Sequence, residues 1–466
     1  MNPNLNIIEN SILVIFGISG DLSRRKILPA IYHLIKDNML PEKMTIIGTS
    51  RKDISLDELM KEVELCVLED SKVCDQKVLL KFKNMLSIIK FDPTNMNHYL
   101  SLKERFKKIE DQNKECFNRL YYLSVPPSSV GPIIKKLGLS GLNKGCSNGS
   151  GKSRLLIEKP FGNDLDSAKH LISEISKFFK EDQIFRIDHY LAKETAQNIF
   201  AFRKHNPVFW KLWDKNSISS IEVKALEKIG IENRVDFYEH MGALKDLVQN
   251  HLIQLLSLIT MEIKPNNSTQ SSDIHKAKLK LLKQIMPLNR QTFKEVRLGQ
   301  YKNYKKEVSN PNSDIETYVK LKLEINNRRW LGTPIYLETG KALDRKSTEI
   351  VINFKTKNIQ QTNSLTFRIQ PNEGIDIKLI VKEPGLTDKY KEAFMDFSYQ
   401  KTFNQSTHPD AYERVLVDAL KGDQTLFATS AEVLASWEIL EPLLKYWKKH
   451  PKILKIYQEG SNPSNI

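Results

Sequence analysis

The chain has 466 residues, enough for two or three domains, with 71 lysines and arginines against 56 aspartates and glutamates. The formal charge of +15 suits anionic partners such as phosphate metabolites, nucleic acid or a membrane surface. No apolar run approaches the roughly 20 residues of a membrane helix, and no arginine–glycine tract or zinc-finger spacing supports nucleic-acid binding.

The four cysteines, Cys66, Cys74, Cys116 and Cys146, form no CxxC pair and show no metal-ligand spacing. We therefore expect no metal site, and we expect free thiols in a reducing compartment. The amino-terminal residues lack the basic start and apolar core of a signal peptide. Together these features predict a cytoplasmic protein.

The amino-terminal region is predicted to form one half of a dinucleotide-binding unit. Residues 12–16 are a continuous apolar run, typical of a buried parallel strand, and they end at the turn 17–22. An apolar helical stripe over residues 27–35 follows, and residues 44–48 predict a second strand. Strand, glycine turn, helix and strand in this order favour a Rossmann-type fold.

The rest of the chain continues this α/β pattern and then changes character. Further strands are predicted at 119–125 and 154–157, followed by a helix at 165–180. We place the domain boundary after this helix, with a Rossmann-type domain over residues 1–187 and a second domain over residues 188–466.

The second domain is predicted to be α+β, with a large, mostly antiparallel sheet. Its strand-like runs, separated by turn residues, are 218–225, 318–325, 335–338, 349–354, 365–369 and 376–381. Its helices are predicted at 242–261, 412–420 and 431–447, with polar loops at 264–273 and 302–313 and a loose tail at 460–466.

Three features near the predicted strand ends suit a dinucleotide. Gly17 and Gly20 would let the backbone approach a pyrophosphate closely, although a tight turn without a ligand is the alternative. Arg51, after the second strand, suits a 2′-phosphate and hence NADP, unless it is an ordinary surface arginine. Lys159, in a Glu-Lys-Pro sequence after a strand, could bind a substrate hydroxyl or the nicotinamide amide.

Residues 186–194 concentrate charged and polar groups around only three aliphatic side chains. If a helix begins at Asp188 or His189, then His189 and Lys193 lie four residues apart on one face. Backbone N–H groups at a helix start also attract anions, so this segment predicts a phosphate site. Asp188 would then be left to orient a catalytic base; the alternative is an ordinary solvated helix start.

The long helix predicted at 242–261 carries Asp246 and His251 amid an apolar stripe. A histidine in this setting is either a satisfied core residue or a general base. Asp246 lies five residues before His251, about 140° around a regular helix. We therefore expect the carboxylate that orients His251 to come from elsewhere, and Asp188 is the candidate.

Taken together, these motifs resemble the glucose-6-phosphate dehydrogenase family, in order, from about residue 12 to residue 447. The matching segments are 17–26, 121–127, 158–162, 186–194, 242–251, 339–341, 410–414 and 422–427. The resemblance implies oxidation of glucose 6-phosphate at C1 to 6-phosphogluconolactone, the first step of the oxidative pentose phosphate pathway. The hydride acceptor would be NADP, with NAD as a second candidate.

The same resemblance implies a role for each matching residue. His251 would take the proton of the C1 hydroxyl, and Asp188 would hold its imidazolium. The sugar hydroxyls would be bound by Lys159, Glu227, Asp246 and Lys341, and the phosphate by His189, Tyr190, Lys193 and Lys346. The cofactor would be bound by Gly17, Ser19, Gly20, Arg51, Tyr122, Pro126 and Lys159. The family also implies a homodimer or a dimer of dimers that pairs through the large sheet.

Two positions depart from the family pattern, and two other functions fit part of it. Ala192 stands where the family usually has glycine, and Glu338 where it usually has arginine, which puts the electrostatics near Lys341 in question. A sugar dehydrogenase of the glucose–fructose oxidoreductase type would share the Glu-Lys-Pro and the histidine but lack a phosphate site like that of His189 and Lys193. A non-catalytic basic protein that binds nucleic acid is the other alternative.

Overall fold

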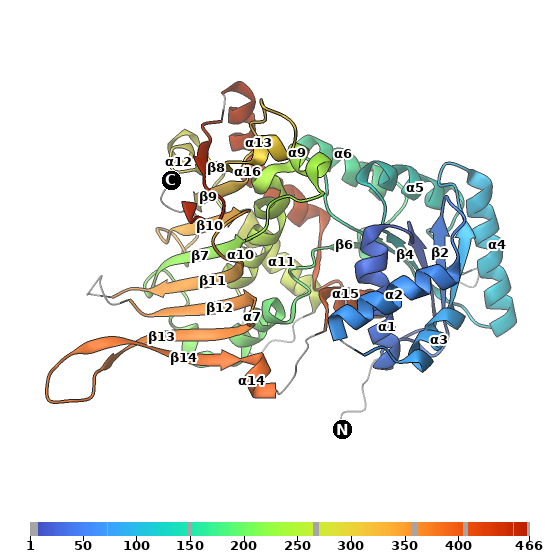
Figure 1. The fold of residues 1–466 in the computed structure, drawn as a ribbon, viewed down its shortest axis with the longest axis horizontal. Coiled ribbons are helices and arrows are strands. Elements are labelled where there is room, and N and C mark those ends of the chain that lie inside the picture. Colours follow the sequence, from blue (N-terminus) through green and yellow to red (C-terminus); the bar gives the residue numbers. More distant parts are fainter. Residues whose placement is uncertain are drawn as a thin grey trace. The chain divides into compact units, whose positions relative to one another are not determined.

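The structure is a computed structural model that describes residues 8–71, 73–146, 151–263, 270–356, 362–403, 409–450 and 452–463. The chain divides into two compact units (Figure 1). Unit 1 comprises Met1–Gly162, Asp166–Ala192 and Pro409–Ser430, and unit 2 comprises Asn163–Leu165, Lys193–His408 and Ala431–Ile466. The second segment of unit 1 thus ends at Ala192, close to the predicted domain boundary, but a segment from near the carboxyl terminus also joins this unit. The domain limits at 1–187 and 188–466 stay a prediction.

Unit 1 is built on a seven-stranded sheet with the order β15-β6-β5-β4-β1-β2-β3. Its strands are β1 (Ser11–Phe16), β2 (Met44–Ser50), β3 (Leu86–Lys90), β4 (Asn118–Leu123), β5 (Ser153–Ile157), β6 (Ile184–Ile187) and β15 (Phe427–Ala428). Every pair is parallel except β15 with β6. Without β15, this is the strand order of dinucleotide-binding folds, and it confirms the predicted Rossmann-type domain.

The helices of unit 1 include one, α15 (Ala411–Lys421), whose start and end are both fixed by capping residues. They are η1 (Ser23–Ile27, a π-helix), α1 (Leu28–Lys36), α2 (Leu56–Ser71), α3 (Gln76–Met85), α4 (Met96–Asn113), α5 (Pro127–Leu139), α6 (Leu165–Ser176), η2 (Glu181–Gln183, a 3-10 helix) and α15. In α15 the Asp410 carboxylate accepts the N–H of Tyr412 at 2.9 Å, and the Glu413 carboxylate accepts the N–H of Asp410 at 3.2 Å. This reciprocal capping box fixes the start of α15, and Gly422 ends it with a φ of 76°.

Strand β1 sets the position of the predicted cofactor turn. All six of its residues are buried, and it pairs with β2 on one side and β4 on the other. The N–H of Gly17 donates to the Thr49 carbonyl at 3.2 Å, and the N–H of Ser124 donates to the Phe16 carbonyl at 3.0 Å. The turn therefore lies at the carboxyl ends of three adjacent strands, the edge where ligands of this fold bind.

The prediction of four free thiols is wrong for one pair of cysteines. Cys116 and Cys146 form a disulfide, with their Cα atoms 5.9 Å apart, whereas Cys66 and Cys74 are thiols. Cys116 comes just before β4 and Cys146 a few residues before β5, and the parallel pairing of these strands brings their amino ends together. Sequence spacing alone could not show this proximity. The cytoplasmic location, which rested partly on free thiols, stays a prediction.

Unit 2 contains a nine-stranded mixed sheet with the order β14-β13-β12-β11-β7-β10-β9-β8-β16. Its strands are β7 (Ile218–Leu226), β8 (Arg297–Tyr301), β9 (Tyr318–Leu323), β10 (Ile335–Gly340), β11 (Ser347–Phe354), β12 (Ser364–Gln370), β13 (Gly374–Lys382), β14 (Tyr390–Ser398) and β16 (Lys455–Tyr457). Pairing is antiparallel except between β7 and β10 and between β8 and β16. This confirms the predicted large, mostly antiparallel sheet.

Two helices of unit 2 begin within segments predicted to be loops. The helices of this unit are α7 (Glu194–His205), α8 (Pro207–Trp210), α9 (Val235–Ala243), η3 (Leu244–Leu252, a π-helix), α10 (Ile253–Thr260), α11 (Ser271–Leu282), α12 (Arg290–Phe293), α13 (Tyr304–Glu307), α14 (Tyr399–Phe403) and α16 (Ser430–Lys449). Helices α11 and α13 begin inside the loops predicted at 264–273 and 302–313, of which residues 264–269 lie outside the described residues. Within the described ranges, no helix combines the length and apolarity needed to cross a membrane.

The tail predicted to be loose from residue 460 is held by backbone hydrogen bonds over its first residues. The N–H of Gly460 donates to the Ala342 carbonyl at 2.8 Å, and Ser461 forms a β-bridge with Leu343. Residues 464–466 lie outside the described residues.

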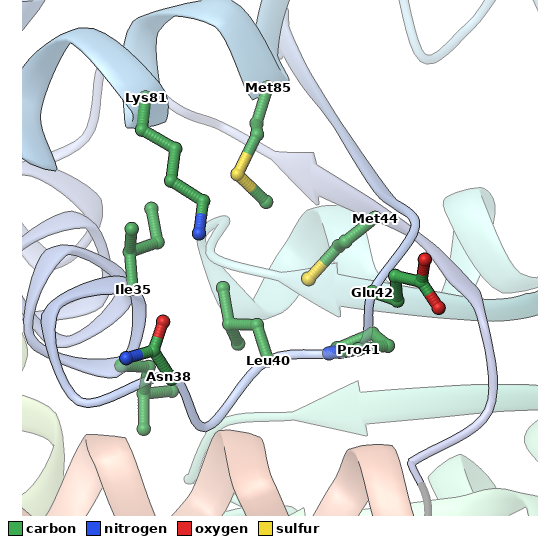
Figure 2. A pocket seen from close by; sticks show the side chains of 9 residues that line it. Ile35, Asn38, Leu40, Pro41, Glu42, Met44, Lys81 and Met85 are labelled. Atoms are coloured by element: carbon green, nitrogen blue, oxygen red, sulfur yellow. The ribbon is translucent and has the colours of Figure 1, made fainter.

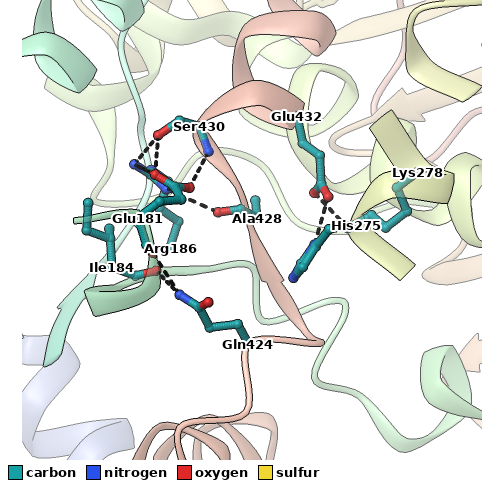
Figure 3. Close-up of polar contacts among 9 residues, drawn as sticks. All are labelled: Glu181, Ile184, Arg186, His275, Lys278, Gln424, Ala428, Ser430 and Glu432. Carbon is teal, nitrogen blue, oxygen red and sulfur yellow. Dashed lines mark hydrogen bonds and ion pairs between the residues drawn. The ribbon is translucent and has the colours of Figure 1, made fainter. Parts of the chain in front are cut away.

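A buried ionic cluster joins two helices of unit 2 (Figure 3). The carboxylate of Glu432 on α16 lies 2.9 Å from the amine of Lys278 and 2.8 Å from Nδ1 of His275, both on α11. Burial opposes ionisation of Glu432, but the charges of Lys278 and His275 hold the pKa of this carboxyl below its ordinary value. The cluster therefore fixes α11 against α16.

Candidate active site

The turn after β1 depends on glycine at its first position. Gly17 has a φ of +81°, and a Cβ atom there would overlap the carbonyl oxygen of Ser124. A Cβ atom at Gly20 would lie 3.1 Å from the carbonyl oxygen of Gly17, and Ser19 between them is exposed. The turn thus presents open backbone and a hydroxyl at the ligand edge of the sheet, as a pyrophosphate site requires.

Arg51 is exposed directly after β2, at the same edge of the sheet. Hydrogen bonds from Thr94 lower the pKa of the Asp92 carboxyl, just after β3, and the charges of His98 and Arg51 lower it further. This position, after the second strand, is where dinucleotide-binding folds contact the adenosine ribose or its 2′-phosphate.

The Glu-Lys-Pro segment after β5 contains a carboxyl with an unusual environment. The hydroxyl of Tyr122 donates to Oε1 of Glu158 at 2.6 Å. Burial raises the pKa of Glu158 to about 7, although the bond from Tyr122 and the charge of Lys159 oppose this shift. Of the two other predicted cofactor residues nearby, Tyr122 is fully buried in β4, whereas Pro126 is exposed before α5.

The segment that begins at Arg186 is anchored on the edge of the unit 1 sheet (Figure 3). The guanidinium of Arg186, only 1% exposed, donates to Glu181 at 2.8 Å and to the hydroxyl of Ser430 at 2.5 Å. Beside it, the amide of Gln424 donates to the carbonyl of Ile184 at 2.9 Å. Segment 409–430 therefore binds strand β6 through these hydrogen bonds. Residues 188–192 begin at the end of this fixed strand.

The helix start expected at Asp188 or His189 is wrong. The carboxylate of Asp188 accepts the N–H of Tyr190 at 3.0 Å, and its carbonyl accepts the N–H of Leu191 at 3.0 Å. These bonds form a turn, and α7 begins only at Glu194, with Lys193 as its N-cap residue. The short side chain of Asp188 bonds to the backbone two residues ahead, which competes with helix formation. His189 and Lys193 therefore do not share a helix face.

The predicted phosphate-binding side chains have different surroundings. The amine of Lys193 contacts the amide oxygen of Gln370, at the end of β12. Tyr190 is buried, His189 is half-buried, and Lys346 is exposed just before β11. The imidazole of His189 packs against the ring of Tyr190, with ring centroids 4.9 Å apart.

The long helix predicted at 242–261 is present as a continuous helical segment from Leu244 to Thr260, but its first nine residues form the π-helix η3. Gly242 has a φ of 64° and a ψ of 174°, which breaks the chain direction between α9 and the π-helix η3. A Cβ atom at Gly242 would lie 2.5 Å from the carboxylate of Glu316. This carboxylate accepts the N–H of Leu244 at 3.2 Å and pairs with Lys452 at 2.8 Å. Glu316, which the sequence analysis missed, therefore fixes the start of the helix that carries His251.

The π-helical geometry changes the relation between Asp246 and His251. In a π-helix each N–H bonds five residues back, so residues five apart lie close to one full turn from each other. The angle of about 140° holds for a regular α-helix and therefore does not describe this π-helical segment. Asp246 and His251 are both buried, and Asp246 pairs with Arg234 at 3.1 Å.

A second group of predicted residues gathers at the ends of β7 and β10, on which η3 packs. The amine of Lys341, directly after β10, contacts the carboxylate of Glu227, directly after β7. The same amine lies 5.5 Å from the centre of the Tyr238 ring. Burial raises the pKa of Tyr238 well above its ordinary value, and the charges of Asp246 and Glu227 raise it further. Tyr238, also missed from the sequence, thus lies next to several of the predicted sugar-binding residues.

The departure at Glu338 does not disturb Lys341. Glu338 accepts a hydrogen bond from the Tyr318 hydroxyl at 2.9 Å and lies 3.5 Å from the amine of Lys320, both on β9. Lys341 is three positions further along and pairs with Glu227 instead. The negative charge of Glu338 is therefore balanced by its neighbours on the adjacent strand, Tyr318 and Lys320.

A cavity of about 320 Å³ in unit 1 lies apart from these groups (Figure 2). It is lined mainly by apolar side chains: Leu34, Ile35, Asn38, Leu40, Pro41, Glu42, Met44, Lys81 and Met85. Met44 is the first residue of β2, whereas Arg51 follows its last residue. The cavity is therefore at the amino edge of the sheet, opposite the edge where the cofactor turn lies.

Comparison with known proteins gives a consistent result. The model of the glucose-6-phosphate dehydrogenase NAD binding domain matches residues 14–198, and that of the C-terminal domain of the same enzyme matches residues 200–465. The glucose-6-phosphate 1-dehydrogenase of Chlamydia muridarum is 38% identical, over 99% of this chain and 95% of its own length. That of Borreliella burgdorferi is 39% identical, over 94% of this chain and 92% of its own length.

A solved structure of a glucose-6-phosphate dehydrogenase in complex with its substrate glucose-6-phosphate superimposes with a TM-score of 0.90. It is 33% identical and covers 98% of this chain, which in turn covers 96% of it. The agreement extends over both units, each of which has the architecture expected of the corresponding family domain. The chain therefore belongs to the glucose-6-phosphate dehydrogenase family of oxidoreductases.

Proposed function

We propose that this chain oxidises glucose 6-phosphate at C1 to 6-phosphogluconolactone with His251 as the general base. The observation that carries the proposal is the position of His251, buried on a π-helix that packs on the strand ends bearing Glu227 and Lys341. A base held rigidly beside polar groups that suit sugar hydroxyls can meet C1 of a bound sugar. The alternatives outside this family have no comparable support.

The chemistry assigned to His251 is proton removal. Hydride leaves C1 only as the C1 hydroxyl loses its proton, so a positioned base lowers the barrier, typically by about 10²- to 10⁴-fold in rate. We assign Asp188 to stabilise the imidazolium that forms. Its buried carboxylate already accepts the N–H of Tyr190, which holds it in one orientation.

The remaining substrate contacts follow from chemistry and position. Lys159, Glu227, Asp246 and Lys341 would bind the sugar hydroxyls, and His189, Tyr190, Lys193 and Lys346 the phosphate. The contact between Lys341 and Glu227 supports the first group, because the pair holds both charges where a hydroxyl can bridge them. Phosphate binding far from C1 would orient the sugar for the reaction.

The residues present fit NADP, which supplies the acceptor for the hydride when bound. The glycine turn with Gly17, Ser19 and Gly20 suits the pyrophosphate, and Arg51 suits the 2′-phosphate. Tyr122, Pro126 and Lys159 would lie toward the nicotinamide. Arg51 favours NADP over NAD, and initial rates measured with each cofactor would show whether NAD also serves.

The edge strand β14 supports self-association. Its side chains Tyr390, Phe394 and Met395 are 55–64% exposed, and among the residues that the structure describes β14 pairs only with β13. Exposed apolar side chains on a free sheet edge are unfavourable in water unless another surface covers them. We propose that a second copy of the chain covers this surface, in a homodimer or a dimer of dimers.

The assignment of His251 is tested by His251→Asn. We expect kcat with glucose 6-phosphate to fall by at least about a hundredfold while KM changes little, because the base acts in the transition state. The control is His205→Asn, at the exposed end of α7, which should retain normal kinetics. A near-normal kcat for His251→Asn would exclude His251 as the base.

A further inference from the structure

The segment 409–430 brings side chains from near the carboxyl terminus to both ligand-binding segments of unit 1. Helix α15 packs on η1 and α1, which follow the glycine turn. The carboxylate of Asp410, its N-cap residue, lies 3.4 Å from the amine of Lys26 on η1. The first turn of α15 is therefore close to the start of the cofactor-binding helix.

Tyr412, on the same turn of α15, faces the predicted phosphate-binding segment. Its ring lies almost parallel to the imidazole of His189, with an angle of 10° between the planes and 6.4 Å between the centroids. Tyr190 meets the same imidazole at 63°, close to an edge-to-face arrangement. Two rings, one from the segment itself and one from α15, thus lie beside the imidazole of His189.

The position of Tyr412 is in turn well determined. Its N–H is bound by the Asp410 carboxylate, and its ring is 91% buried among the core residues of unit 1. At the other end of α15, the guanidinium of Arg154 donates to the carbonyl oxygens of Ala419 and Leu420 at 2.9 and 2.6 Å. Because α15 is fixed at both its start and its end, the ring of Tyr412 is a rigid neighbour for the imidazole of His189.

The arrangement recorded between Tyr412 and His189 is one of two nearly parallel rings. Burial raises the pKa of the Tyr412 hydroxyl, and the charges of Glu158, Asp410 and Asp188 raise it further, so it stays protonated at neutral pH. Phenylalanine would preserve the ring face, whereas leucine would remove it. This difference separates an aromatic contact from a hydroxyl contact.

We propose that Tyr412 is a positioning residue that holds the imidazole of His189 for the phosphate of the sugar substrate. The inference rests on the proposed role of His189 as a phosphate ligand. It extends the substrate site to α15, from which no contact with substrate was assigned. We assign Tyr412 no contact with the substrate, so its effect on substrate binding would pass through His189.

The proposal predicts a specific kinetic pattern. Tyr412→Leu should raise KM for glucose 6-phosphate about two- to tenfold, the range of an aromatic pair, without changing KM for NADP. Tyr412→Phe should stay within about twofold of the unaltered enzyme. Tyr99→Leu, which removes a fully buried ring from α4 of the same unit, should lower thermal stability without raising KM for glucose 6-phosphate.

The decisive measurement combines Tyr412→Leu with His189→Ala. His189→Ala alone should raise KM for glucose 6-phosphate, and adding Tyr412→Leu should cause no further increase, because the residue it positions is already gone. An equal further increase, or a Tyr412→Phe variant as impaired as Tyr412→Leu, would overturn the proposal.

The experiments test the phosphate role of His189 and the positioning role of Tyr412 separately. If His189→Ala raises KM and Tyr412→Leu does not, the positioning role is wrong and the phosphate role of His189 stands. If His189→Ala leaves KM unchanged, both the phosphate role and the positioning role are wrong.

Discussion

At the scale of single residues, the carboxyl of Glu158 is the group most open to a test by pH. Burial raises its pKa to about 7 in the folded protein, above the ordinary value of 4.5. Between these two values the folded state binds a proton that the unfolded state releases. The stability contributed by this group is therefore fully present below pH 4.5 and is lost as pH rises through 7.

The corresponding prediction concerns Glu158→Gln, which cannot ionise. The free energy of unfolding of the unaltered protein should fall relative to that of Glu158→Gln as pH rises from 5 to 8, measured by urea denaturation at each pH. Glu104→Gln, at an exposed site on α4, serves as the control and should show no such divergence. Parallel stability curves for Glu158→Gln and the unaltered protein would contradict the raised pKa.

The individual site residues were predictable to different degrees. His251, Asp188 and the glycines of the cofactor turn could be named because their motifs are local in the sequence. Glu316 and Tyr238 could not, since each acts on the site from a distant position in the sequence: Glu316 binds the backbone of Leu244, and Tyr238 lies near Lys341. The sequence around Glu316 or Tyr238 contains no motif that predicts such a contact.

At the scale of elements, the π-helix η3 depends on the glycine that precedes it. Gly242→Ala should lower the free energy of unfolding by about 1–3 kcal/mol, because alanine is strained at a φ of 64° and its Cβ would meet Glu316. It should also lower kcat, since Glu316 fixes the start of the helix that carries His251. Urea denaturation and steady-state kinetics measure the two effects.

A matched glycine provides the control for this prediction. Gly131 lies inside α5, and a Cβ atom there would meet nothing within 4 Å. Gly131→Ala should therefore change the free energy of unfolding by no more than about 1 kcal/mol, because the helix preference of alanine is offset by its position before Pro132, and should leave kcat unchanged. Equal effects of the two substitutions would show that the strain at Gly242 is not specific.

The elements with strong apolar patterns were predicted correctly, and those without were not. Strand β1 is a continuous apolar run after its first residue, and its burial follows from this pattern. Strand β14 was missed because most of its side chains are exposed, and β15 because it has only two residues. The π-helical turns of η3 leave the apolar spacing of residues 244–252 close to that of an α-helix, so periodicity could not reveal them.

At the scale of the whole molecule, unit 1 is not complete without the segment 409–430. Helix α15 contributes Val415, Leu416, Ala419 and Leu420 to the core of this unit, and β15 extends its sheet. A fragment of residues 1–192 should therefore lack a cooperative thermal transition in circular dichroism. Adding a peptide of residues 409–430, but not a scrambled peptide of the same composition, should restore the transition. A fragment that unfolds cooperatively alone would contradict this dependence.

The proposed self-association makes a second prediction at this scale. Phe394→Glu, on the exposed edge strand β14, should shift the mass measured by sedimentation toward the monomer, because a charge would be buried in the interface. Leu65→Glu, at a similarly exposed position on α2 of unit 1, should leave the mass unchanged. A monomeric unaltered protein, or an unchanged mass for Phe394→Glu, would exclude β14 as the interface.

The late return of the chain to unit 1 also has a consequence for biosynthesis. The amino-terminal part of this unit ends at Ala192. The final helix and strand of the unit lie in the segment that ends at Ser430. At a translation rate of about 5–20 residues per second, roughly 10–50 s separate the two on the ribosome. During this interval the nascent amino-terminal half exposes the apolar surface that α15 later covers, so it is the natural substrate for chaperones that bind before synthesis is finished.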